Sequence, residues 1–187
     1  MNRAVVGVDA SISSTGVVLL SDTVRALKRV QTKPRGEEIG ARIDRIRQSA
    51  AGIREAIDGE IDGGELDVQL VVIEMPAFGK STAMTHMLAG HWWMTVHVLE
   101  QLAPVAQVAP GTLKKFATGN GRAEKDEVLA AAIGVFATSI RNNDVADASV
   151  LAAMGATHLG IEFGGAFAPS GVASVQSVRW PELRGSN

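Results

Sequence analysis

Four carboxylates stand where one expected element of secondary structure ends or another begins, and these side chains are the best suited to chemistry. Asp9 closes a first apolar strand, and Glu74 closes a second one. Asp144 and Asp147 lie three residues apart at the start of the last expected helix, so their side chains share one face. A carboxylate at the carboxyl end of a buried strand lies at the edge where open α/β sheets bind ligands.

Four such carboxylates in one place would repel one another unless cations neutralise them. Oxygen ligands of this kind favour hard divalent ions such as Mg²⁺ or Mn²⁺. Two such ions, about 3.5–4 Å apart, can activate a water molecule and stabilise the leaving oxygen of a phosphoryl displacement. The alternative is that the acids are helix caps and ion-pair partners, and Asp144 fits a cap as well as it fits a ligand.

The elements that must position these acids begin with three short strands, predicted at residues 3–9, 17–20 and 23–32. Isoleucines repeat at steps of three, four or seven between Ile39 and Ile57 and predict an amphipathic helix, with four arginines on its other face: Arg42, Arg45, Arg47 and Arg54. An acidic loop over residues 58–67 then leads to a strand at 68–74, a helix at 81–101 and a strand at 105–108.

The remaining segments are helical up to about residue 160. We expect a helical turn at 110–116, a helix at 124–140 and a last helix at 144–159, which begins after the capping pair Asn142-Asn143. This order predicts an α/β fold whose mixed central sheet has antiparallel opening strands and flanking helices. Residues 1–160 form the predicted domain, and residues 161–187, rich in Gly, Ser, Ala and Pro, form an irregular tail.

The composition excludes several classes of protein. The chain has 187 residues, 46% of them hydrophobic, with a net charge of −2, which fits one globular domain and excludes dominant disorder. No apolar run approaches the roughly 18 residues of a membrane span, and the N-terminus does not resemble a signal peptide. The absence of cysteine excludes a disulfide scaffold, a thiolate metal site and a cysteine nucleophile. We expect a cytoplasmic protein.

The small net charge conceals a possible basic surface. Five of the 20 acids lie within residues 58–67, where no basic residue occurs. Without them, 18 basic and 15 acidic residues leave a charge of +3. If metal ions neutralise four more carboxylates, the remaining balance is +7, which is compatible with nucleic-acid binding.

Four blocks of the sequence resemble the RuvC-type Holliday junction resolvases, especially their phage-borne relatives. The blocks occur in family order between residues 5 and 155: Gly7–Gly16, Val72–Gly79, Ala109–Lys125 and Asn143–Ala148. The resemblance implies an RNase H-like fold and a dimeric endonuclease that nicks branched DNA such as four-way junctions, in bacteria or phage-infected cells. It also implies two-metal hydrolysis with two Mg²⁺ ions, for which Mn²⁺ substitutes, giving 5′-phosphate and 3′-hydroxyl ends.

The same resemblance assigns roles to single residues. The metal ligands would be the four acids Asp9, Glu74, Asp144 and Asp147. Either Lys114 or Lys115 would help to neutralise the transition state. The DNA contacts would come from Phe78, Lys80, Lys114, Lys115, Arg122 and Lys125. Phe78 would stack on bases at the junction centre or else anchor a helix start, and Lys80 would bind a phosphate or face water.

Other functions remain open or are excluded. The serious alternatives are an RNase H-like nuclease for forks, flaps or structured RNA, and a non-catalytic module that binds branched DNA. An ATPase of the actin type also has a small-residue hairpin after an aspartate, but it needs a second domain, so we expect no nucleotide cofactor. The helix at 81–101 carries three histidines among apolar residues and is expected in the core or at a dimer interface, with Trp92 and Trp93 pointing in different directions.

Overall fold

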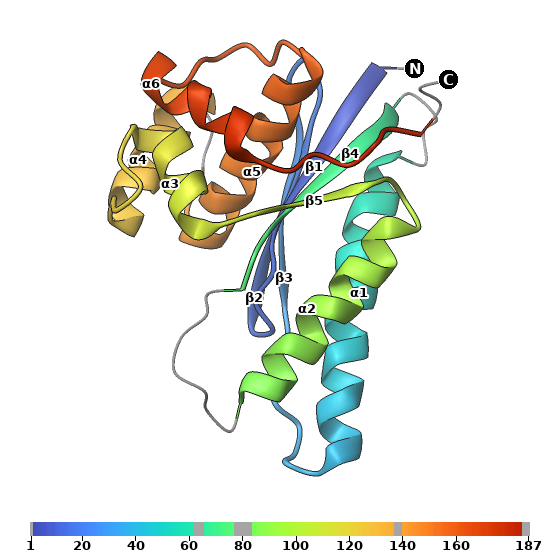
Figure 1. Cartoon of the computed structure of the whole chain (residues 1–187). Coiled ribbons are helices and arrows are strands. Elements are labelled where there is room, and N and C mark those ends of the chain that lie inside the picture. Colours follow the sequence, from blue (N-terminus) through green and yellow to red (C-terminus); the bar gives the residue numbers. More distant parts are fainter. Residues whose placement is uncertain (1, 62–65, 77–83, 137–139, 185–187) are drawn as a thin grey trace.

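The computed structural model describes residues 2–61, 66–76, 84–136 and 140–184. Figure 1 shows how its elements are arranged. The strands are β1 (Asn2–Asp9), β2 (Ser14–Leu20), β3 (Val24–Gln31), β4 (Leu66–Glu74) and β5 (Val105–Val108). The helices are α1 (Ile39–Ile61), α2 (Thr85–Glu100), α3 (Pro110–Thr118), α4 (Lys125–Phe136), α5 (Asn143–Leu159) and α6 (Pro169–Val172), followed by the 3₁₀ turn η1 (Ala173–Ser177).

The strands of the described residues form one mixed sheet in the order β3-β2-β1-β4-β5. β1, β2 and β3 are antiparallel neighbours, because short turns connect them. β4 is parallel to β1, and β5 is parallel to β4, because α1 and α2 return the chain before each of these strands. The predicted α/β class, with antiparallel opening strands in a mixed sheet, is confirmed.

Helices cover both faces of the sheet (Figure 1), and alternate strand residues pack against each layer. Along β1, Val5 belongs to the core under α5, whereas Val6 and Val8 belong to the core under α1 and α2. Along β4, Val72 faces α5 and Ile73 faces α2. By this alternation, the terminal residue of each of these two strands points toward the α5 face.

Helix α5 lies against the middle of the sheet and is built from small residues. Eleven of its 17 residues are buried, most of them alanine, valine and leucine. A Cβ atom on Gly7 would lie 2.0 Å from the Ala148 carbonyl oxygen, and one on Gly16 would lie 2.0 Å from the Asp144 carbonyl oxygen. The helix backbone therefore touches the strands directly at these two glycines, which no other residue would permit.

Helix α1 begins at Ile39 as predicted but differs from its prediction in its C-terminal end and in the burial of two residues. Ile46, Ile53 and Ile57 are buried as expected, but Ile39 is 88% exposed. The helix continues to Ile61, so part of the predicted acidic loop is helical. Arg45, predicted on the outer face, is instead buried and donates hydrogen bonds to the Thr32 side chain and carbonyl and to the Ser13 hydroxyl.

The segment after α5, predicted as an irregular tail, is largely coil but packs firmly on the domain. Phe167 and Val175 are buried in the core beneath α5, and the ring centroids of Phe167 and Phe116 lie 4.9 Å apart. Further on, the Arg184 guanidinium binds the carbonyl oxygens of Glu100 and Leu102 at the end of α2. None of the helices in the described ranges is long and apolar enough to cross a membrane.

Replacing Gly16 by alanine tests how closely α5 must approach the sheet. The added methyl group overlaps the Asp144 backbone, which is fixed within a helix and cannot move like a side chain. We expect Gly16→Ala to lower the free energy of unfolding in urea by about 1–3 kcal/mol. Gly59→Ala is the control, because its Cβ meets nothing within 4 Å, and it should stabilise α1 by about 0.5–1 kcal/mol. Equal effects of the two variants would contradict this account.

Candidate active site

Asp9 and Glu74 end two adjacent parallel strands and lie side by side. Val8 pairs with Ile73 in the register of β1 and β4, so the next residue of each strand projects from the same edge of the sheet. The two carboxyl groups are close enough to interact, because repulsion from Glu74 raises the pKa of Asp9.

The first turn of α5 brings two more acids to this edge. The helix is capped by Asn142, whose side-chain oxygen accepts a hydrogen bond from the Val145 amide at 2.9 Å. Asp144 is therefore not the cap of this helix. Asp147 lies one turn further along the helix, close enough to both Asp9 and Glu74 to raise their pKa values.

Burial and mutual repulsion together keep protons on this cluster. Burial, followed by repulsion from Glu74, Asp147 and Asp144, raises the pKa of Asp9 to about 8. Burial and repulsion from Asp147 raise the pKa of Glu74 to about 7. Burial, together with repulsion from Asp144, raises the pKa of Asp147 to about 6. A group of acids that holds protons near neutral pH is a site where a cation is strongly favoured.

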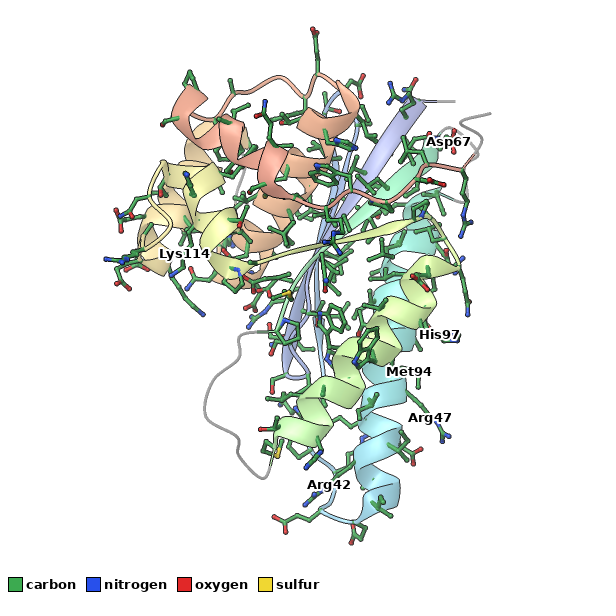
Figure 2. All side chains as sticks on the ribbon, viewed as in Figure 1. Arg42, Arg47, Asp67, Met94, His97 and Lys114 are labelled. Atoms are coloured by element: carbon green, nitrogen blue, oxygen red, sulfur yellow. The ribbon has the colours of Figure 1, made fainter. Side chains whose placement is uncertain are left out.

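Two lysines face the acids, from α3 and from the start of α4. Lys125 lowers the pKa values of Asp9, Glu74 and Asp147, and Lys114 lowers those of Glu74 and Asp147. Figure 2 shows Lys114 on α3, on the opposite side of the sheet from Arg42 and Arg47 on α1. The two lysines therefore add positive charge beside the carboxylates.

Of the other predicted basic contacts, Lys115 and Arg122 lie on the exposed surface. Lys115 is the neighbour of Lys114 on α3, but it does not enter the electrostatic interactions of the three acids. Arg122 lies in the exposed turn before α4, where its backbone amide donates a hydrogen bond to Oδ1 of Asn120. Phe78 and Lys80, predicted to contact DNA, lie outside the described residues.

Asp144 has two partners that sequence reasoning missed. The Ser14 hydroxyl donates a hydrogen bond to its Oδ2, and the Arg29 Nε lies 3.6 Å from the same oxygen. Arg29 also donates to the Ser14 hydroxyl at 2.7 Å. The only signal in the sequence is the alternation along β3, which cannot assign Arg29 to a face until the strand register is known.

Glu74 also has a hydrogen-bond partner on the other face of the sheet that the sequence did not reveal. The indole nitrogen of Trp92 on α2 donates a hydrogen bond to the Glu74 carbonyl oxygen at 2.9 Å. The neighbouring Trp93 is 65% exposed, so the two indoles point in different directions, as expected. His91 is buried against Ser49, and burial, with the nearby Arg45, lowers its pKa to about 4, which is the behaviour of a core histidine.

The donor set fits hard divalent cations. Asp9, Glu74, Asp144 and Asp147 offer only carboxylate oxygens, the ligand type that Mg²⁺ and Mn²⁺ prefer. As the side chains stand, no three acids or histidines of the described residues already form a group that could hold a metal ion.

Comparison with known proteins identifies what the chain resembles. The family model described as "Crossover junction endodeoxyribonuclease RuvC" matches residues 5–158. Among the curated proteins, none matches the chain at a significant level. The family match spans both strand-end acids, the lysine-bearing segment and all but the last residue of α5.

Solved structures of junction resolvases share the fold. The structure of Thermus thermophilus RuvC has a TM-score of 0.65 at 18% identity, over 84% of this chain and 97% of that one. The structure of the same protein in complex with a Holliday junction substrate has a TM-score of 0.64 at 17% identity, over 80% of this chain and 90% of that one. The yeast mitochondrial Holliday junction resolvase has a TM-score of 0.50 at 13% identity, over 92% of this chain and 78% of that one. These similarities confirm the RNase H-like architecture.

The raised pKa values predict an unusual dependence of stability on pH without metal. The folded chain keeps protons on Asp9, Glu74 and Asp147 up to about pH 8, 7 and 6, whereas the unfolded chain loses them near 3.8 to 4.5. The folded state therefore binds more protons, and its free energy of unfolding must fall as pH rises from about 6 to 8. Urea unfolding in a chelating buffer would measure this decrease.

Asp9→Asn serves as the control for that measurement. The amide cannot ionise, so the variant should lose much of the decrease and be more stable than the parent chain at pH 8 in the chelating buffer. A parent chain whose stability rises between pH 6 and 8 would contradict the raised pKa values.

Proposed function

Because this chain belongs to the RuvC family of crossover junction endodeoxyribonucleases, hydrolases that act on phosphodiester bonds, we propose that it resolves four-way DNA junctions with a divalent-metal site. The ligands would be Asp9, Glu74, Asp144 and Asp147. One observation carries the proposal: acids from two strand ends and one helix converge and hold protons near neutral pH beside two lysines. We place this activity on DNA in the cytoplasm of a bacterial or phage-infected cell.

The proposed ions are two Mg²⁺, for which Mn²⁺ would substitute. When bound, divalent ions polarise the scissile phosphate and lower the pKa of an attacking water. Asp9 is central among the ligands, because its carboxyl group interacts with all three other acids. Loss of its proton, whose pKa is about 8, is the step that readies the cluster for cations. The expected products carry a 5′-phosphate and a 3′-hydroxyl.

The lysines bind and neutralise the substrate phosphate in this proposal. Lys114, which is half-buried and faces Glu74 and Asp147, is better placed than Lys115 to balance the extra charge of the pentacovalent transition state. Lys125 begins α4 and faces all three acids with raised pKa values, so it would hold a DNA phosphate next to the scissile one. Arg122 would extend this contact along the backbone.

A homodimer completes the proposal. A four-way junction has nearly two-fold symmetry and needs two nicks, which a symmetric pair of active sites supplies. The exposed large apolar residues of helix α2 and its N-cap include Met84, Leu88 and Trp93, the last 65% exposed. Large apolar side chains on one helix are typical of a subunit interface.

Substitution of Asp9 tests the activity. Asp9→Asn keeps the shape of the side chain but removes its charge, so it should reduce cleavage of a four-way junction in Mg²⁺ by on the order of 10²–10³-fold. Binding of the same junction should be retained or improved, because a negative charge near the phosphates is removed. Labelled-strand cleavage and a gel-shift assay measure the two effects.

Asp44→Asn is the matched control, since Asp44 is an exposed acid on α1, on the opposite face of the sheet. Fork, flap and structured RNA substrates should be assayed in parallel. Faster cutting of those substrates would favour an RNase H-like nuclease of different selectivity. Tight junction binding without cleavage in Mg²⁺ or Mn²⁺ would overturn the proposed activity and favour a binding module.

Lys125→Ala tests the phosphate contact. Loss of one contact should weaken junction binding and reduce the slope of log affinity against log salt concentration by about 1. Lys28→Ala removes the same charge from the opposite face of the sheet, where Lys28 binds Glu60 at 2.7 Å, and should leave the slope unchanged. An unchanged slope for Lys125→Ala would remove Lys125 from the phosphate contacts.

A further inference from the structure

Arg29 reaches the candidate active site from the edge strand of the sheet. The strand register pairs Arg29 with Gly16, and Gly16 with Asp9, so the three residues form one row across β3, β2 and β1. Residues that pair directly across strands project from the same face. Gly16 carries no side chain, and the backbone of Asp144 occupies the space above it. Asp144 therefore lies between Arg29 and Asp9.

Both contacts to the Asp144 carboxylate are made to the same oxygen. Ser14 donates its hydroxyl to Oδ2, and the Arg29 Nε lies 3.6 Å from Oδ2 while donating to Ser14 at 2.7 Å. Oδ2 is thus held on the side of β3, while the Asp144 carboxylate lies close enough to the cluster to raise the pKa values of Asp9 and Asp147.

We propose that Arg29, acting with Ser14, is a positioning residue that anchors Oδ2 of Asp144 and so presents Oδ1 to a divalent cation. The inference rests on the proposed metal site. Without an anchor, Asp144 would be the fourth carboxylate of a crowded cluster, and repulsion would turn it toward solvent. A fixed guanidinium on the far side offsets this repulsion without entering the cluster itself.

The contact is too exposed to serve chiefly in stability. The side chains of Arg29 and Asp144 are 43% and 26% exposed, and exposed ion pairs contribute little to folding. Three other ion pairs, Lys28 with Glu60 and two within α1, lie away from the acids. Among these pairs, Arg29 alone holds a candidate ligand. Residues that hold metal ligands typically change metal affinity or activity 10- to 100-fold when they are replaced.

Binding of Mn²⁺ to the full chain without DNA tests the inference, with free Mn²⁺ measured by electron paramagnetic resonance. Arg29→Gln should weaken Mn²⁺ binding about 10- to 100-fold. Ser14→Ala should also weaken Mn²⁺ binding, and Arg29→Lys should bind Mn²⁺ more tightly than Arg29→Gln does. Lys28→Gln is the matched control on the same strand and should bind as the parent chain does. Circular dichroism should show all variants folded.

A double-mutant cycle separates positioning from a general charge effect. If Arg29 acts through Asp144, Arg29→Gln should change Mn²⁺ affinity less than about twofold in an Asp144→Asn background. Unchanged or tighter Mn²⁺ binding by Arg29→Gln, with Asp144→Asn clearly weakened, would overturn the inference and leave the proposed function standing. Unchanged Mn²⁺ binding and junction cleavage in Asp144→Asn would overturn both, because Asp144 would then not be a ligand.

Discussion

The direct contact between the backbone of α5 and two glycines of the sheet is the constraint on which the candidate site depends. Gly7 and Gly16 have no side chains, so the helix lies on β1 and β2 at a distance that any Cβ would prevent. This contact brings Asp144 and Asp147 to the edge where Asp9 and Glu74 end their strands. Asp9 therefore lies close to Asp144 and Asp147, although more than 130 residues separate it from them in the sequence.

The acids repel one another at this distance, and basic residues of the surrounding elements offset part of that repulsion. Three of the acids hold protons near neutral pH, because burial and repulsion oppose their ionisation. Three cations come from three different elements: Lys114 from α3, Lys125 from α4 and Arg29 from β3. A nuclease needs such an arrangement, because its carboxylates must be free to bind metal while the nearby surface still attracts a phosphate backbone.

The opposite face of the sheet supports the same edge. Trp92 holds the Glu74 carbonyl from α2, and the buried Arg45 of α1 holds Ser13 and Thr32, next to the start of β2 and the end of β3. The helix that carries Trp92 also exposes Trp93. A dimer formed through α2 would thus contact an element that touches the strand end bearing a ligand, which links the proposed assembly to the geometry of the proposed site.

The sequence alone predicted the element order, the mixed α/β sheet and the four acids at element ends, because apolar periodicity and capping chemistry are local properties. It also indicated Asn142-Asn143 as the start of α5, where Asn142 is the cap. The fold was needed to show that Lys114 and not Lys115 faces the acids, since adjacent helical residues point about 100° apart and the phase of α3 depends on what it packs against. The burial of Arg45 and the contact of Arg29 with Asp144 are likewise visible only in the folded chain, because strand register and helix docking join residues whose spacing in the sequence carries no local signal.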